Sequence, residues 1–180
     1  MISLYLQVGE QMDWSITIWV SALSIFILAV ILACYMTRKG KSRNYMVKGL
    51  TGVSAGILLF ISLFLPWVKM VEYGVQISGI EMGDLFVFLI KMQIMQVITM
   101  FLLLFSFLVI LGGFLSIVGY DSGMEIVKYA SGLALFMSVV IVLAIGTIPS
   151  TQVYVTLEMS PGLYIFGSIL GLVSTRLEKR

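Results

Sequence analysis

Long apolar runs alternate with short polar stretches along the whole chain. About 20 apolar residues form a helix that crosses the roughly 30 Å hydrocarbon core of a bilayer. The last run is short for that task, and we expect its helix to continue through Leu177. The pattern predicts an all-α polytopic membrane protein with about five transmembrane helices. The predicted spans are Trp14–Met36, Leu50–Val68, Gln96–Gly119, Tyr129–Ile148 and Leu163–Thr175.

The composition agrees with a membrane location. The 180 residues are 60% hydrophobic and 11% charged, whereas soluble domains are about 45–50% apolar and about 25% charged. So few charged side chains would leave a soluble globule of this size poorly hydrated. We therefore expect a multi-pass protein of the cell membrane.

The polar stretch Thr37–Lys48 indicates how the chain is oriented. Cytoplasmic loops of membrane proteins carry an excess of Lys and Arg. With the N-terminus outside and the C-terminus inside, nine of the eleven basic residues fall on the cytoplasmic side. We expect the basic loop to contact lipid headgroups and not nucleic acid, since a membrane span flanks it on each side. Its basic residues are Arg38, Lys39, Lys41, Arg43 and Lys48.

The third helix is predicted to be unusually long. Asp84–Gly119 contains no proline over 36 residues, which corresponds to about 54 Å of helix. Either Leu85–Met95 protrudes beyond the outer headgroups, or the helix is strongly tilted. Asp84 is a suitable N-cap for this helix.

Two outer segments have the features of β-strands. Val71–Gly83 contains three glycines and an alternating stretch, and Thr151–Gly162 alternates aliphatic with polar residues. Each segment ends in an aliphatic-Glu-Met sequence and leads into a helix. This similarity predicts an internal repeat of residues 49–119 and 129–180, with the two outer strands pairing into a sheet over the helices.

The predicted organisation has three parts. Residues 1–36 form an N-terminal segment with the first helix, residues 37–48 form the basic loop, and residues 49–180 form a four-helix bundle of two hairpins. Two helical hairpins with β structure in the outer loops form a layout that resembles the claudin-type tetraspan architecture. The Trp/Gly-Leu-Trp and two-cysteine signature of that family is absent, so the resemblance implies a layout and no function.

The residue types exclude several classes of chemistry. The chain has no histidine, and Cys34 is its only cysteine. These residues therefore cannot supply an internal disulfide, a zinc site of Cys and His ligands, or a haem with an axial histidine. Glycine-rich phosphate loops and Ser-His-Asp sets are also missing. We expect no enzyme, no cofactor and no metal centre.

Two sets of residues are candidates for binding or packing. Small residues four apart let helices approach closely, either inside the bundle or against another subunit. Acidic residues in the outer loops could gather around a cation, or they could serve as helix caps and salt-bridge partners. A nearby lysine is either buried in hydrocarbon, and then functional, or interfacial. The small residues are Gly52, Gly56, Gly112, Ser116, Gly167 and Gly171, and the outer polar cluster is Glu81, Asp84, Lys91 and Glu158.

These features favour a non-enzymatic accessory, scaffold or assembly subunit of a membrane complex. It would associate with other subunits, or with itself, through small-residue helix faces and an outer β cap. The alternative is a component of a small channel or transporter with a pathway along the third helix. The polar lining of such a pathway would be Gln93, Gln96, Thr99, Ser106 and Ser116.

Overall fold

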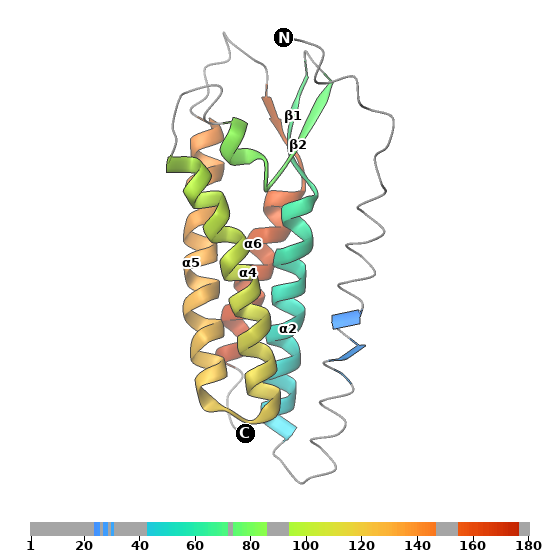
Figure 1. Cartoon of the computed structure of the whole chain (residues 1–180), viewed down its shortest axis with the longest axis vertical. Helices are drawn as coiled ribbons and strands as arrows, with labels where there is room; N and C mark the ends of the chain where they lie inside the picture. Colours follow the sequence, from blue (N-terminus) through green and yellow to red (C-terminus); the bar gives the residue numbers. More distant parts are fainter. Residues whose placement is uncertain are drawn as a thin grey trace.

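The computed structural model describes residues 24–25, 27–28, 30, 43–71, 74–85, 94–146 and 155–176. Within these residues, four long helices lie side by side, and a three-stranded sheet covers one end of the bundle (Figure 1). The elements are α2 (Arg43–Phe64), β1 (Pro66–Met70), β2 (Val75–Ser78), α4 (Ile94–Val118), α5 (Asp121–Gly146), β3 (Val155–Leu157) and α6 (Ser160–Arg176).

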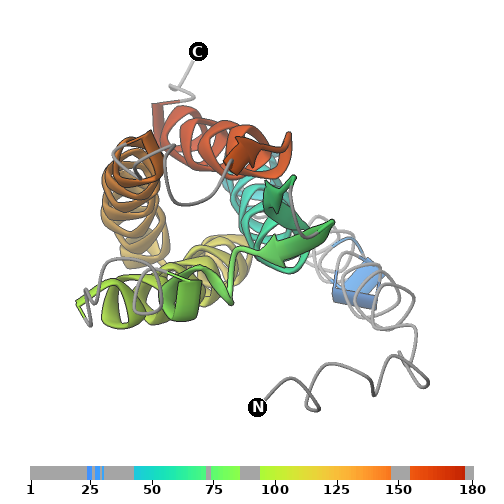
Figure 2. The same cartoon turned by 90° about the horizontal axis from the view of Figure 1, so that it is seen from above.

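The helices form a closed ring in which α2 and α5 each contact both α4 and α6 (Figure 2). Neighbours in the ring run antiparallel, as expected for an up-and-down bundle. Three helices are long and apolar enough to cross a membrane: Tyr45–Phe64, Gln96–Val118 and Asp121–Gly146. This confirms a mostly helical protein with membrane-length helices and a small sheet. The predicted first span lies largely outside the described residues, and α6 has only 17 residues.

The sheet has the order β2-β1-β3, and both neighbours of β1 are antiparallel to it. The two strands predicted in the outer loops are therefore present, but their predicted direct pairing is wrong. The strand between them, β1, begins within the predicted second span, Leu50–Val68. Pro66 explains this difference, since it ends the helical path after α2 and can begin a strand, where its missing N–H is tolerated.

The prediction of one continuous helix over Asp84–Gly119 is also wrong. Residues 82–85 are helical, and Gln96 Nε2 in α4 donates a 2.8 Å hydrogen bond to Asp84 Oδ1. In a continuous helix, residues twelve apart would lie about 18 Å from each other along the axis. A Cβ atom on Gly83 would lie 2.6 Å from Gln96 Cα, so glycine permits the turn 82–85 to approach the start of α4 closely. The excess length that implied protrusion or tilt therefore disappears.

Asp84 does not act as an N-cap. It lies inside the helical turn 82–85, where its N–H donates to Glu81 O at 3.1 Å. Its carboxylate accepts a hydrogen bond from the Gln96 side chain. The side chain thus joins the turn to α4.

The turn between α4 and α5 is shorter than the polar segment Tyr120–Lys128 suggests, because α5 already begins at Asp121. Gly119 has a φ of +95°. Its N–H donates to Ser116 O and the next N–H donates to Leu115 O, both at 2.9 Å. This is a Schellman arrangement, in which glycine supplies the left-handed residue that ends a helix. The basic loop is likewise partly helical, since Arg43 and Lys48 belong to α2.

Candidate functional site

The small residues of α2 pack against α4 of the same chain. A Cβ atom on Gly52 would lie 3.3 Å from Gly113 Cα, and one on Gly56 would lie 2.5 Å from Ile110 Cγ1 and 2.7 Å from Ile110 N. The backbones of the two helices thus approach closely, as small residues allow. This face of α2 is occupied by α4 of the same chain and is closed to another subunit.

The other small residues also lie in contacts within the bundle. Gly112 faces Val127 of α5, with a hypothetical Cβ 2.9 Å from Val127 Cγ2, and Gly167 faces Leu59 of α2 at 3.2 Å. Gly171 lies directly against the side chain of Ser131. Ser116 is completely buried. All six predicted packing residues are therefore inside the bundle, where they set the spacing between its helices.

An aromatic and polar cluster joins the sheet to the bundle. Trp67 of β1 and Tyr164 of α6 are both fully buried, and their rings meet edge to face at 5.6 Å. Trp67 Nε1 donates to Ser62 O at 2.7 Å, and Tyr164 Oη donates to Leu102 O at 2.9 Å. The Trp67 indole thus joins β1 to α2, and the Tyr164 hydroxyl joins α6 to α4. Both buried donors have an acceptor, as low-dielectric surroundings require.

The sequence did not reveal this cluster. Trp67 falls within the predicted span Leu50–Val68, and no local pattern distinguishes Tyr164. In the structure, Trp67 instead follows Pro66 in strand β1, and its side chain is fully buried. The one sequence feature that relates to this cluster is Gly79 in the outer loop. A side chain is not tolerated at this position, since a Cβ atom there would lie 2.6 Å from Trp67 Nε1. A glycine in the outer loop therefore marks the place where the loop crosses a large ring.

Three of the polar residues predicted to line a pathway along the third helix form hydrogen bonds within the chain, whereas the buried Ser116 hydroxyl has no hydrogen-bond partner in the described structure. Gln96 binds Asp84, Thr99 Oγ1 donates to Gln96 O at 2.9 Å, and Ser106 Oγ donates to Leu102 O at 2.8 Å. Ser106 and Ser116 have no accessible surface, so neither side chain borders a cavity that could hold water. Gln93 lies outside the described residues. Within the described residues, Thr99, Ser106 and Ser116 are therefore buried parts of the packing of α4.

The outer acidic residues do not come together around a cation. Glu81 Oε2 accepts from Ser78 N and Ser78 Oγ at 3.0 and 2.8 Å, and Asp84 accepts from Gln96. Glu158 N donates to Trp67 O at 3.0 Å, which ties the end of β3 to β1. Within the described part of the chain, no group of three or more Asp, Glu, Cys or His residues could hold a metal ion. Lys91 lies outside the described residues.

The basic residues predicted to set the topology are only partly described. Arg38, Lys39 and Lys41 lie outside the described residues, whereas Arg43 and Lys48 are in the first two turns of α2, at the end of the bundle opposite the sheet. Nearby, the Tyr45 phenol is hydrogen-bonded to the Asp121 carboxylate, which joins the starts of α2 and α5.

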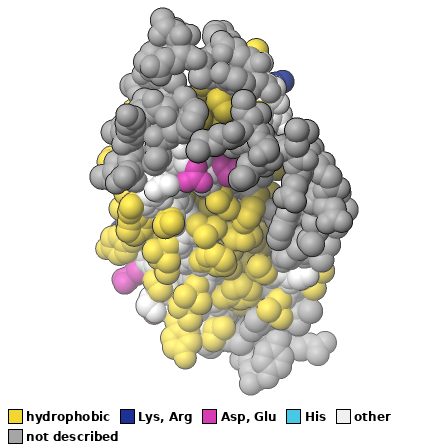
Figure 3. All heavy atoms as spheres, turned by 45° about the horizontal axis from the view of Figure 1, so that its top comes forward, with side chains coloured by type: hydrophobic (Ala, Val, Ile, Leu, Met, Phe, Trp, Pro, Cys, Tyr) yellow, Lys and Arg dark blue, Asp and Glu magenta, His cyan; other side chains and the backbone are white. Residues whose placement is uncertain are grey.

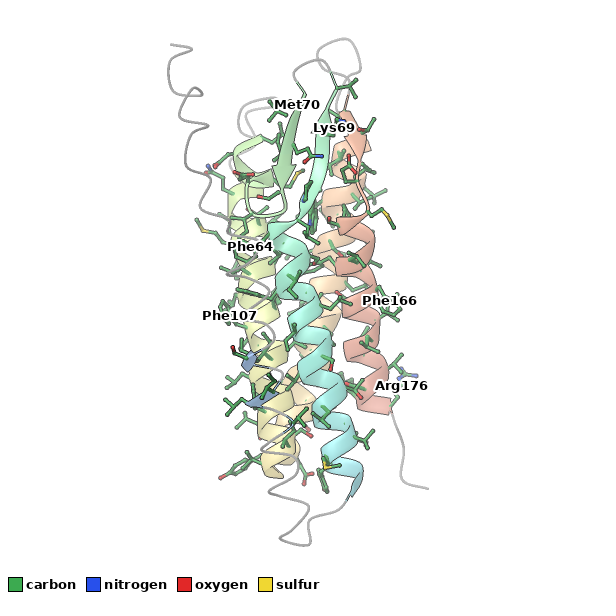
Figure 4. The ribbon with its side chains drawn as sticks, turned by 90° about the vertical axis from the view of Figure 1, so that its right-hand side faces the viewer. Phe64, Lys69, Met70, Phe107, Phe166 and Arg176 are labelled. Carbon is green, nitrogen blue, oxygen red and sulfur yellow. The ribbon has the colours of Figure 1, made fainter. Side chains whose placement is uncertain are left out.

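The exterior of the helices is apolar over most of its length. Three helices present large exposed hydrophobic side chains at three- and four-residue spacing. Phe166 and Arg176 both point outward from α6, and Arg176 lies at the end of the bundle opposite Lys69 (Figure 4). The exposed residues are Val97, Met100, Phe101, Leu104, Phe107 and Leu111 on α4, Tyr129, Leu133, Phe136, Val139 and Leu143 on α5, and Leu163, Phe166, Ile169 and Val173 on α6.

No protein family model, no curated protein and no solved structure matches this chain. Its function must therefore be argued from its own residues. Those residues show an interior whose polar groups are largely hydrogen-bonded within the chain and an exterior that is apolar between two charged ends.

Proposed function

We propose that this chain is an integral protein of the cell membrane with five transmembrane helices, an external N-terminus and a cytoplasmic C-terminus. Three features support this arrangement. Three helices have the length and composition of membrane spans. Three of the four basic residues with described side chains, Lys48, Lys128 and Arg176, lie toward the end away from the sheet, whereas Lys69 lies in β1. Glu81, Asp84 and Glu158 lie at the sheet end. Basic residues gather on the cytoplasmic side of membrane proteins, so the sheet is external.

Within this membrane location, the protein acts as a non-enzymatic accessory or assembly subunit. The observation that carries this proposal is the pairing of the interior polar groups. Tyr164, Ser106, Ser62 and Trp67 are buried and engaged with backbone carbonyls, which makes them parts of the packing. Catalytic groups, in contrast, must be accessible to a substrate, and their pKa values are typically shifted to suit the reaction.

The surface that associates with a partner is the outer β cap, formed by β1, β2 and β3. The small-residue faces are filled by helices of the same chain and cannot serve this purpose. The cap instead offers exposed Val75 and Gln76 on β2 and exposed Leu157 on β3. Paired strands that project beyond the bundle present both side chains and backbone groups to a protein outside the membrane.

A photo-crosslinking amino acid at position 76 tests this proposal in intact cells. The expected result is a discrete crosslinked adduct from position 76, identified by mass spectrometry after purification in mild detergent. The same amino acid at position 122, an exposed site at the far end of the bundle, serves as the control and should give no such adduct. Equal adducts from both positions, or none from position 76, would contradict association through the cap.

A further inference from the structure

We infer that the bundle is fitted to a bilayer with a hydrocarbon core of about 24 Å, thinner than the roughly 30 Å of a typical membrane. This inference rests on the membrane location in the proposed function but not on association with a partner. It follows from the polar and charged residues that flank the exposed apolar surfaces of α5 and α6 and from the contacts that relate their depths to α4.

The boundary away from the sheet is defined on two helices. On α5, the exposed side chains change from polar to apolar between Lys128 and Tyr129, where the Lys128 ammonium lies 5.6 Å from the centre of the Tyr129 ring. On α6, the exposed apolar residues end at Val173 and are followed by exposed Arg176. The polar exposed residues of α5 before this boundary are Asp121, Ser122, Glu125 and Lys128.

The two basic residues lie at the same depth. Gly171 of α6 is in contact with Ser131 of α5, since a Cβ atom on Gly171 would lie 3.0 Å from Ser131 Cβ. Arg176 lies five residues beyond Gly171 and Lys128 lies three residues from Ser131, both away from the sheet. At 1.5 Å per residue these positions agree to within about 3 Å along the axis. Lys128 and Arg176 therefore mark one plane.

The boundary at the sheet end is defined by the starts of α4 and α6. Gln96 of α4 binds exposed Asp84, and Ser160 begins α6 directly after Glu158 and Met159. The bond from Tyr164 Oη to Leu102 O aligns these two helices. Gln96 lies six residues beyond Leu102 and Ser160 lies four residues beyond Tyr164, so the two positions agree to within about 3 Å.

The same two planes, carried over to α4 through its contacts, cross α6 and α4 at the same separation. On α6, Ser160 and Arg176 are separated by 16 residues, or about 24 Å. On α4, Gly112 marks the lower plane, because a Cβ atom there would lie 3.1 Å from Val127 N, next to Lys128. Gln96 and Gly112 are also separated by 16 residues, again about 24 Å. Figure 3 shows hydrophobic side chains covering this face of the helices, with acidic side chains at the border toward the sheet end.

A short apolar band has a physical consequence. In a thicker bilayer, either the lipid must thin around the protein or the boundary charges must reach toward the headgroups, and both responses cost free energy. Lys128 and Arg176 can extend their side chains in this way, but Asp84 is held by Gln96 and has a short side chain. The sheet end is therefore the more rigid of the two boundaries.

The test is the thermal stability of the purified full chain in vesicles of dimyristoleoyl, dioleoyl or dierucoyl phosphatidylcholine, whose hydrocarbon cores thicken in that order. The unfolding midpoint, followed by circular dichroism, should be highest in dimyristoleoyl vesicles and fall at each step. The double variant Lys128→Leu, Arg176→Leu lengthens the apolar band and should move the highest midpoint to dioleoyl vesicles. Phe136→Leu, in the middle of the band, should leave the order unchanged.

A highest midpoint in dioleoyl or dierucoyl vesicles for the unmodified chain would overturn the inference, and so would an unchanged order in the double variant. Neither result depends on whether position 76 gives an adduct with a partner, so the two proposals can fail separately. Release of the chain from vesicles by an alkaline wash would remove the membrane location and with it this inference.

Discussion

Helices α2 and α5 occupy equivalent places in the two hairpins of the predicted repeat, yet their surroundings differ. On α5, five large apolar side chains are exposed, and Leu143 is 66% accessible. Among the described residues of α2, Val47 is the only large hydrophobic residue that is exposed. Ile25, a described residue of the predicted first span, packs against the cluster of Val53 and Ile117 beside α2.

The comparison shows that similar apolar sequences serve two different kinds of contact. α2 has protein neighbours on several sides and approaches α4 through glycines that cannot be enlarged. α5 contacts α4 and α6 on one side and presents a regular stripe on the other. In a soluble protein, polar residues would mark the helix face that points away from the core. Lipid is as apolar as a protein core, so hydropathy does not distinguish the two faces of a membrane helix. Glycine contacts therefore distinguish an inner helix face from an outer one.

The largest expected effect comes from shortening a core side chain on α2. Leu59 is fully buried, and Leu59→Ala should lower the free energy of unfolding by about 3 kcal/mol through lost contacts and a cavity. Phe136 on the stripe of α5 is 62% exposed, and Phe136→Ala should change it by less than about 0.5 kcal/mol. Denaturant unfolding in detergent micelles measures both values. Equal losses would remove the difference between the two helices.

The next effect comes from adding one carbon atom at a helix contact. Gly56→Ala should cost about 2 kcal/mol, because the new Cβ would overlap the backbone and side chain of Ile110. Gly132→Ala on α5 is the matched control, since its nearest neighbour would be Leu172 Cδ2 at 3.9 Å. That change should be neutral or stabilise the helix by up to about 1 kcal/mol. A tolerated Gly56→Ala would contradict close packing of α2 on α4.

A smaller effect is expected for the hydroxyl that joins α6 to α4. Tyr164→Phe removes the donor to Leu102 O and leaves a buried carbonyl with one partner fewer, which should cost about 1 kcal/mol. Tyr129→Phe removes a hydroxyl from a side chain that is 65% exposed, and its unfolding midpoint should match that of the unmodified chain. If the two variants unfold alike, the buried hydrogen bond contributes nothing measurable.

The smallest effect has the opposite sign. Ser131 Oγ is buried without a hydrogen-bond partner in the described structure and lies against Gly171. Ser131→Ala removes an unsatisfied polar atom and relieves crowding, so it should raise the free energy of unfolding by less than about 1 kcal/mol. Ser106→Ala, which deletes a hydroxyl that donates to Leu102 O, should not stabilise the protein. A loss of stability in Ser131→Ala would indicate a partner for that hydroxyl.

The sequence predicted the elements better than their contacts. The apolar runs located α2, α4, α5 and α6, and the outer alternation located β2 and β3. The strand β1 was missed because Trp67 and Val68 continue the apolar run of α2, and hydropathy does not distinguish a buried strand from the end of a span. The break before α4 was missed because it depends on the approach of Gly83 to Gln96, a contact between residues that a linear pattern treats as one helix.

The candidate residues divide in the same way. The small residues were found by their spacing, but spacing alone left open whether they face a helix of the same chain or a different subunit. The Trp67–Tyr164 contact brings together residues 97 positions apart, and no local pattern records it. The predicted repeat and the membrane orientation remain predictions.

The orientation of the chain is the central claim, because the external cap and the cytoplasmic basic end both depend on it. Single cysteines in a Cys34→Ser background, introduced as Gln76→Cys and Ser122→Cys, can be labelled with a membrane-impermeant maleimide in intact cells and again after permeabilisation. Both native residues are exposed, one on the sheet and one at the opposite end of the bundle. We predict labelling of position 76 in intact cells and of position 122 only after permeabilisation. The reverse pattern, or labelling of both positions in intact cells, would contradict the account.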